Sequence, residues 1–267
     1  MPAATMSAIS LKIKLYLATI ERINNSRPWL DALGKGFWLG VLSREDLQAI
    51  DRIYYQQTPN YCDETYNKSG FLDWERKAFL KFFQSCQTVL VAAVGGGREC
   101  FALSSLGLDV DGFECNQQLL DCARNLFAQE KIEGEFHLTE PDAVWHFDEI
   151  YDGAIVGWSA YMLIQTREFR IDFLRGMRAQ LSEGAPILVS FFAGRSDELY
   201  FKRIHSMANI LRRLLGRDKT ELGDDLRPLS FAHWFLEIEI QMEFAEAGFK
   251  VAYYNGEVYG HAVGLAV

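Results

Sequence analysis

Hydrophobic and polar positions follow two different periods from residue 88 onward. Short apolar runs predict strands, and longer stretches with an apolar position at every third or fourth residue predict helices. The predicted strands are 88–94, 109–114, 134–138, 151–156 and 186–192, and the predicted helices are 98–105, 117–129 and 167–182. Asn116 is a favourable N-cap for the second of these helices, and Gly184 follows the third. The alternation of strands and helices predicts right-handed crossovers and a parallel sheet.

The C-terminal residues have the pattern of an antiparallel hairpin. Two strand-like stretches, 250–254 and 257–267, flank the dipeptide Asn255-Gly256. Asn-Gly is a strong hairpin signal, because both residues tolerate the positive φ of a type I′ turn. With the five earlier strands, this hairpin predicts an α/β, doubly wound fold with a mostly parallel, seven-stranded sheet.

The remaining segments predict a cap and a lid. Residues 1–86 are interpreted as an N-terminal helical cap, in which Ser43 is an N-cap candidate, and residues 87–267 as the sheet domain. An insertion at about 193–234 contains a basic amphipathic stretch, and we expect it to lie above the strand ends as a lid. The polar segment 60–69 fits either a simple connector or a mobile loop over the ligand, in which Tyr66 would contact that ligand.

A glycine-rich loop follows the first predicted strand directly. Val94 is followed by Gly95, Gly96 and Gly97, and glycines let the backbone approach a ligand where any Cβ would clash. The first N–H groups of the next helix would point at that ligand. Glu114 ends the following strand, where a carboxylate accepts hydrogen bonds from both hydroxyls of a ribose. Together these features predict a nucleotide-like ligand.

At this point the chain resembles the class I S-adenosylmethionine-dependent methyltransferases, over residues 85 to 267. The resemblance is carried by the glycine loop, by Glu114, by Asp142 in the segment 140–143, and by the segment 151–158. It implies S-adenosyl-L-methionine as the cofactor. The cofactor-binding residues that it implies are Val94, Gly95, Gly96, Gly97, Glu114, Cys115, Asp142, Ala143, Gly157 and Trp158.

Two positions depart from the pattern of that family. Such enzymes commonly have an acid in the first strand and a glycine two residues before Gly95, where this chain has Val91 and Ala93. The usual anchor for the amino group of the methionine moiety is therefore absent. Glu99 and polar residues of the N-terminal region are candidates to replace it.

Methyl transfer requires little catalytic machinery, because the protein mainly aligns the acceptor and, for a hydroxyl, removes its proton. Trp158 and Tyr161 follow the fourth strand and are candidates for the acceptor-side wall, with ordinary aromatic packing as the alternative. His233 is the candidate general base and Tyr161 the second catalytic candidate, although a histidine among aromatic residues also fits a packed role. With Tyr66, these residues form the predicted substrate site.

The composition narrows the function classes. A net charge of −9 argues against general nucleic-acid binding, which depends on neutralising phosphates. The five cysteines form no CxxC pair and no Cys/His spacing suited to zinc, which predicts reduced thiols, no metal and a cytoplasmic protein. No apolar run reaches membrane-spanning length. The sequence leaves open whether the chain forms a homodimer.

The sequence therefore predicts methyl transfer to a small-molecule acceptor, at oxygen in preference to nitrogen. No Asn-Pro-Pro-Tyr or Asp-Pro-Pro-Tyr motif follows the fourth strand, which disfavours amino-group methylation of nucleobases or glutamine. A catalytically inactive cofactor-binding or regulatory protein is the alternative, suggested by Val91 and Ala93. NAD-dependent oxidoreduction is a weaker alternative, because a dinucleotide fingerprint would require a small residue where Cys100 stands.

Overall fold

The computed structural model describes residues 11–194, 198–227, 230–257 and 259–267. It divides into two compact units: Met1–Val41 with Asp197–Leu222, and Leu42–Ser196 with Gly223–Val267. This division differs from the predicted boundary at residue 86. Only the first helix of the expected cap belongs to the smaller unit, and the following helices belong to the unit that contains the sheet.

The smaller unit is a pair of helices, α1 (Leu11–Val41) and α8 (Glu198–Leu214). Two glycines spaced four residues apart on α1 let the helices approach closely. A Cβ on Gly36 would lie 2.8 Å from the carbonyl oxygen of Ile204, and a Cβ on Gly40 would lie 2.8 Å from the Cβ of Leu211. Because α8 belongs to the predicted lid and α1 to the predicted cap, this packing joins two segments that were predicted to be separate.

The larger unit is built on a sheet, which has nine strands within the described residues. The strands are β1 (Thr88–Ala92), β2 (Asp109–Glu114), β3 (Phe136–Leu138), β4 (Gly153–Val156), β5 (Pro186–Ala193), β6 (Asp224–Arg227), β7 (Ser230–Phe235), β8 (Phe249–Asn255) and β9 (Gly260–Ala266). The order β3-β2-β1-β4-β5 is parallel. Strand β9 pairs antiparallel with β5, and β8 pairs antiparallel with β9. These seven strands confirm the predicted doubly wound fold.

Strands β6 and β7 are an addition that the sequence analysis did not predict. They pair antiparallel with each other, and β7 continues the sheet beside the last two residues of β5 through Phe192 opposite Trp234. The predicted C-terminal hairpin is present, but the prediction of a two-residue Asn-Gly turn is wrong. Asn255 is the last residue of β8 and pairs with His261, so the connection is longer than Asn-Gly alone.

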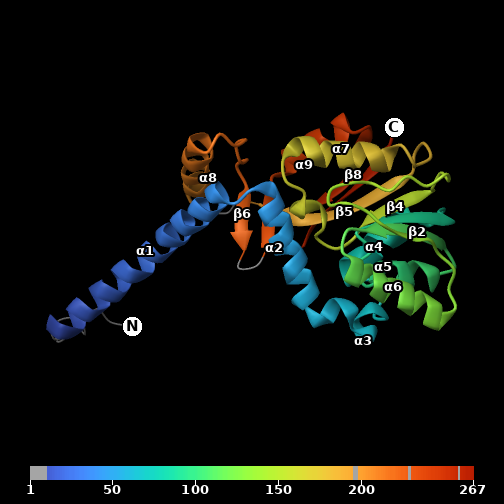
Figure 1. Cartoon of the computed structure of the whole chain (residues 1–267), viewed down its shortest axis with the longest axis horizontal. Coiled ribbons are helices and arrows are strands. Elements are labelled where there is room, and N and C mark those ends of the chain that lie inside the picture. Colours follow the sequence, from blue (N-terminus) through green and yellow to red (C-terminus); the bar gives the residue numbers. More distant parts are fainter. Residues whose placement is uncertain (1–10, 195–197, 228–229, 258) are drawn as a thin grey trace, which may run out of the picture. The chain divides into compact units, whose positions relative to one another are not determined.

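Helices cover both faces of the sheet (Figure 1). One face packs against α4 (Asp73–Phe82), α5 (Arg98–Ser104) and α6 (Gln117–Glu130), and the other against α7 (Arg167–Arg178) and α9 (Glu237–Glu246). The central strands β1, β4 and β5 are almost continuously apolar, as expected for parallel strands buried on both faces. Helix α2 (Arg44–Gln57), the short helices η2 (Pro59–Cys62) and α3 (Glu64–Asn67), and η3 (Tyr161–Leu163) complete this unit.

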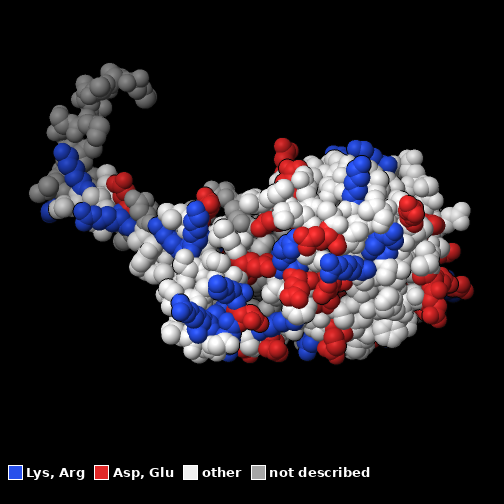
Figure 2. Space-filling model, turned by 90° about the horizontal axis from the view of Figure 1, so that it is seen from above, with Lys and Arg blue, Asp and Glu red and all other residues white. Residues whose placement is uncertain are grey.

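On the face of the larger unit shown in Figure 2, the charged side chains do not separate into one basic and one acidic area. In the view of Figure 2, Lys and Arg side chains are scattered among Asp and Glu side chains over that unit. Among the described residues, no helix combines the length and the apolar character that crossing a membrane requires.

Candidate functional site

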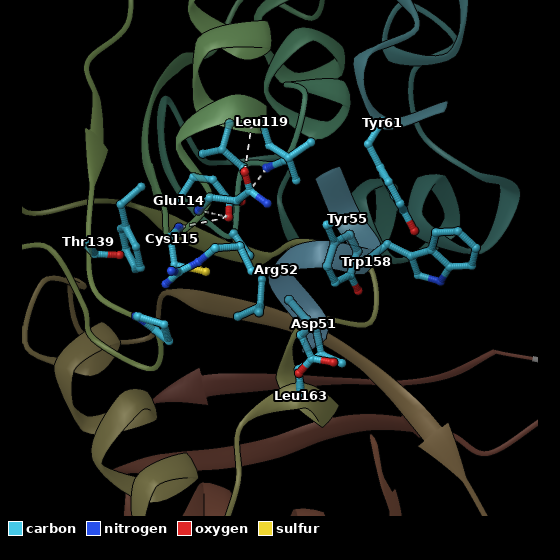
Figure 3. Close-up of a pocket in the computed structure, with 18 of the residues that line it drawn as sticks. Asp51, Arg52, Tyr55, Tyr61, Glu114, Cys115, Leu119, Thr139, Trp158 and Leu163 are labelled. Atoms are coloured by element: carbon cyan, nitrogen blue, oxygen red, sulfur yellow. Dashed lines mark hydrogen bonds between the residues drawn. The ribbon is translucent and has the colours of Figure 1, made fainter. Parts of the chain in front are cut away.

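A cavity lies at the carboxyl ends of β1, β2 and β4, within the larger unit (Figure 3). The glycine loop after β1, the end of β2, the start of α6 and the residues after β4 line one side. Residues of α2, η2 and α3 line the other side. Ligands of open α/β sheets bind at this position, because the loops that follow the parallel strands gather there.

Each of the three positions in the loop requires glycine for a different structural reason. Gly95 lines the cavity with a φ of 58°, a conformation that favours glycine. Gly96 also lines it, and a Cβ there would lie 1.8 Å from the carbonyl oxygen of Tyr61. Gly97 has a φ of 97°, is the N-cap of α5, and is not part of the cavity lining. The positive φ of Gly97 gives it a backbone role at the start of α5, and the cavity lining lends no support to its predicted cofactor contact.

Ala93 shows why a glycine is usual two residues before Gly95. Its φ is 53°, in the left-handed region, which costs a residue with a Cβ roughly 1 kcal/mol. Gly157, after β4, is required by the same loop, because a Cβ there would lie 2.1 Å from the carbonyl oxygen of Ala93. Gly157 does not line the cavity, so its predicted contact with the cofactor is corrected to a supporting role.

Glu114 is held at the end of β2 by the backbone around it. Its Oε2 accepts a hydrogen bond from the Gly95 N–H at 2.8 Å, and its Oε1 accepts bonds from the N–H groups of Cys115 and Asn116, each at 2.9 Å. Burial raises the pKa of this carboxyl, and the three hydrogen bonds oppose the rise. A carboxylate offers about four acceptor positions, so Glu114 keeps capacity for a ligand hydroxyl.

Asn116 is a functional candidate that the sequence analysis treated only as a helix cap. Its Oδ1 does cap α6, accepting from the N–H groups of Gln118 and Leu119 at 3.1 and 3.4 Å. Its Nδ2 is buried and has no hydrogen-bond partner among the described residues, although the residue lines the cavity. A buried amide without a partner is costly, and a ligand acceptor would satisfy it.

The far end of the cavity is formed by the segment after β3. Val94, Cys115, Asp142 and Ala143, which the resemblance proposed as cofactor-binding residues, line the cavity. The Asp142 carboxylate accepts hydrogen bonds from the Arg44 guanidinium at 2.7 Å and the Gln48 amide at 3.0 Å, both on α2. Asp142 therefore ties the covering helix to this end of the cavity.

The two predicted catalytic side chains lie elsewhere. Tyr161 is fully buried and stacks on Phe235, and its hydroxyl donates to Glu243 at 2.6 Å. His233 is buried on β7, with Nδ1 2.7 Å from a carboxylate oxygen of Asp224. Neither residue lines the cavity, so both are packed polar residues of the core. This corrects their predicted catalytic roles and the acceptor-side role of Tyr161.

Aromatic residues and the acid Asp51 also line the cavity. Trp158 and Tyr66, which the sequence proposed as acceptor contacts, are among these lining residues, together with Tyr55 and Tyr61. Asp51 of α2 lines the same part, and Figure 3 shows it near Tyr55 and Leu163. The Phe231 N–H donates to Asp51 Oδ1 at 2.9 Å. Burial, with the nearby Asp142 charge, raises the pKa of Asp51 to about 7, against the hydrogen bond that lowers it.

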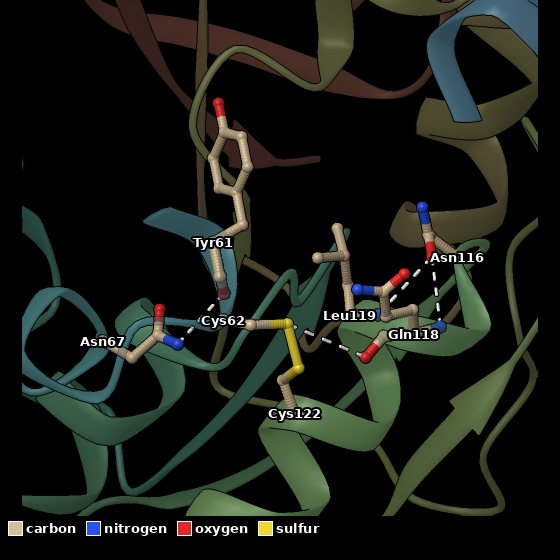
Figure 4. Close-up of a disulfide and its surroundings, with 7 residues drawn as sticks. All are labelled: Tyr61, Cys62, Asn67, Asn116, Gln118, Leu119 and Cys122. Carbon is tan, nitrogen blue, oxygen red and sulfur yellow. Dashed lines mark hydrogen bonds between the residues drawn. A yellow bond between two sulfur atoms is a disulfide. The ribbon is translucent and has the colours of Figure 1, made fainter. Parts of the chain in front are cut away.

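A disulfide links η2, which lines one side of the cavity, to α6, which packs on the sheet. Cys62, at the end of η2, is bonded to Cys122 on α6, across a sequence separation of 60 residues (Figure 4). This corrects the prediction that all five cysteines are reduced thiols; Cys86, Cys100 and Cys115 are free. The segment that it holds carries Tyr61 and Tyr66 over the glycine loop. In the chain-entropy view, a cross-link of this span contributes about 4 kcal/mol to stability.

Comparison with known proteins identifies the fold. No protein-family model and no curated protein matches the chain. A methyltransferase structure from Methanosarcina mazei is 17% identical, with a TM-score of 0.58, and the match covers 74% of this chain and 99% of that one. The 1,6-didemethyltoxoflavin-N1-methyltransferase of Burkholderia thailandensis, solved with S-adenosylhomocysteine, is 12% identical, with a TM-score of 0.59 and coverage of 85% and 91%. An amino pentose methyltransferase from Micromonospora echinaspora, involved in calicheamicin biosynthesis and solved with S-adenosylmethionine, is 14% identical, with a TM-score of 0.55 and coverage of 76% and 95%.

Proposed function

We propose that this chain, which has the class I S-adenosylmethionine-dependent methyltransferase fold, transfers a methyl group to a small-molecule acceptor. One observation carries the proposal. Glu114, the last residue of β2, and the unpartnered amide of Asn116, two residues later, both line a cavity next to the glycine loop. An acceptor and a donor at that place suit the hydroxyls of an adenosyl ribose.

The residues present fit S-adenosylmethionine. Glu114 and Asn116 would hold the ribose, and Asp142, Ala143 and Leu119 line the end where the base would lie. Gly95 and Gly96 leave room for the backbone to approach the ligand. When bound, the cofactor supplies an electrophilic methyl group on a sulfonium. The protein contributes alignment of the acceptor and removal of its proton.

The acceptor side supports an oxygen nucleophile with Asp51 as its base. A carboxylate whose pKa is about 7 is half ionised near neutral pH, which suits a general base. Tyr55 and Trp158 offer flat apolar surfaces for a ring-containing acceptor. An amine acceptor is the second candidate, because an acid among aromatic rings also binds a cationic group. Two of the similar structures are an amino pentose methyltransferase and a methyltransferase named for the N1 position of 1,6-didemethyltoxoflavin.

The inactive-protein alternative predicts a flat or filled site. The cavity lined by Tyr55, Tyr61, Tyr66 and Trp158 supports the enzyme instead. Tyr66 and Trp158 were suggested by the sequence, whereas Tyr55 and Tyr61 were not, and Tyr161 is not part of the lining. The decisive test is calorimetric titration of the purified protein with S-adenosylmethionine and S-adenosylhomocysteine, with NAD as the control. We expect micromolar binding of the first two and none of NAD. If neither S-adenosylmethionine nor S-adenosylhomocysteine binds, the result would favour the catalytically inactive alternative.

Glu114→Gln should weaken binding of S-adenosylhomocysteine by about 1.5–3 kcal/mol, because charge-assisted hydrogen bonds to the ribose are lost. Calorimetry measures this, with Glu133→Gln, an exposed glutamate, as the matched control. A thermal unfolding curve checks that the glycine loop still folds, since Glu114 also accepts three backbone N–H groups. An affinity equal to that of the control would remove Glu114 from the cofactor site.

A further inference from the structure

A buried cluster of one cation and two anions lies beside the glycine loop. Arg98, in the first turn of α5, makes two parallel hydrogen bonds to Glu75 of α4, at 2.6 and 2.7 Å. Its Nη2 also donates to Glu99 Oε1 at 2.6 Å, and its Nη1 to the Gly70 carbonyl oxygen at 3.0 Å. Arg98 is 3% exposed, Glu75 2% and Glu99 5%.

The cluster carries one more negative charge than positive charge when both acids are ionised. Burying an uncompensated charge is expensive, and a protein either neutralises it or supplies a partner. Burial raises the pKa of Glu99, and the negative charge of Glu75 adds to that rise against the attraction of Arg98. The cluster as it stands therefore lacks one positive charge.

The two acids differ in what they leave available. Glu75 has both carboxylate oxygens engaged, by Arg98 and by the Leu72 N–H at 2.7 Å, and it does not line the cavity. Glu99 lines the cavity, and its Oε1 takes the bonds from Arg98 and from the Trp158 N–H at 3.1 Å. Its Oε2 accepts no hydrogen bond from another described residue. Glu99 is thus the member of the cluster that can face a ligand cation.

We propose that Glu99 binds the ammonium group of the amino-acid moiety of the cofactor, with Arg98 and Glu75 holding it in place. The proposal rests on the function proposed above. It would also supply the anchor that the first strand lacks, since Val91 has no polar group and is fully buried. The acid has moved from the strand to the first turn of the following helix, and its bond from Trp158 N–H links the anchor to the end of β4.

The test compares two ligands that differ in the amino-acid moiety. S-adenosylhomocysteine carries the ammonium group, and 5′-methylthioadenosine has the same adenosine and thioether without it. Glu99→Gln should weaken S-adenosylhomocysteine by roughly ten- to a hundredfold, the effect of a lost charge-assisted hydrogen bond. Binding of 5′-methylthioadenosine should stay within about twofold, on the same principle, because it makes no such bond. Glu99→Asp, which keeps the charge, should bind S-adenosylhomocysteine more tightly than Glu99→Gln does.

Three results would overturn the assignment: an unchanged affinity for S-adenosylhomocysteine, equal losses for the two ligands, or equal losses for the Gln and Asp variants. A wild-type protein that binds neither ligand would instead refute the proposed function, and this inference with it. Glu114→Gln is the reference variant, since it should weaken both ligands. Thermal unfolding of each variant shows that the fold is kept; removing a buried charge with Glu99→Gln should not lower the midpoint.

Discussion

Asp51→Asn should lower kcat by about 10²–10⁴-fold, the usual contribution of a general base. The substitution keeps the shape of the side chain and the oxygen that accepts from the Phe231 N–H, so the cover helix should keep its place. It removes the carboxylate that we propose as the base for the acceptor proton. Initial rates with an acceptor found by screening measure the loss, and calorimetry with S-adenosylhomocysteine should show affinity within about twofold of wild type, because the cofactor makes no bond to this residue.

The pH dependence gives the same substitution a second readout. Because the pKa of Asp51 is about 7, kcat/KM of the wild-type protein should rise with pH up to about 7 and then level off. The stability should change in the opposite direction. A pKa raised from 3.8 to about 7 means that, between these pH values, the folded protein keeps a proton that the unfolded chain has released. The free energy of unfolding therefore falls as the pH rises from about 4 to about 7.

Asp51→Asn should remove both the rise of kcat/KM with pH and the fall of stability with pH. Asp148→Asn, at an exposed acid, should remove neither. A variant with wild-type kcat would place the proton acceptor elsewhere. A wild-type rate that does not change between pH 5.5 and 8, a range chosen around the usual titration of such a base, would mean that no group of this pKa acts in the reaction.

The cofactor side of the cavity could be predicted from the sequence because it lies on strand ends. In a parallel sheet the carboxyl ends of neighbouring strands meet at one edge, so Gly95, Glu114 and Trp158 must come together whatever the loops do. The apolar runs fixed those strands to within a few residues. The same rule could not separate lining residues from supporting ones: Gly97 and Gly157 are needed by the backbone, not by a ligand.

The acceptor side could not be predicted, because its residues come from elements that no local pattern places. Asp51 and Tyr55 stand on α2, and the sequence shows only that this segment is helical. The Cys62–Cys122 disulfide could not be predicted either, because nothing in the sequence indicates that two cysteines 60 residues apart lie in contact. His233 had the residue type of a base and a position near the lid, but β7 joins the sheet and buries it.

Tyr161 was a reasonable candidate from its place after the fourth strand, and its actual partners explain why it turns away. Its hydroxyl donates to Glu243, which also takes three hydrogen bonds from the Arg170 guanidinium, at 2.7 to 3.1 Å. Glu243 is 0% exposed and Arg170 1%. The network joins η3, α7 and α9 in the core beneath the acceptor side, so Tyr161 supports the site only through the fold.

Glu243→Ala should therefore lower the free energy of unfolding by about 3–5 kcal/mol, because it leaves a buried guanidinium and a buried phenol without their partner. Urea-induced unfolding, followed by tryptophan fluorescence, measures this as a lower midpoint with an unchanged slope. Asp172→Ala, which breaks the exposed pair with Arg175, is the matched control and should cost less than about 1 kcal/mol.

The double variant Arg170→Met with Glu243→Leu separates the two explanations of such a loss. If the cost of Glu243→Ala comes from the buried Arg170 charge that has lost its carboxylate, replacing both ionic groups by apolar ones should recover most of the stability. If the double variant is as unstable as the single one, the hydrogen bonds to Tyr161 and the shape of the network carry the stability instead. In that case Tyr161→Phe alone should cost more than the roughly 1 kcal/mol of an ordinary hydrogen bond.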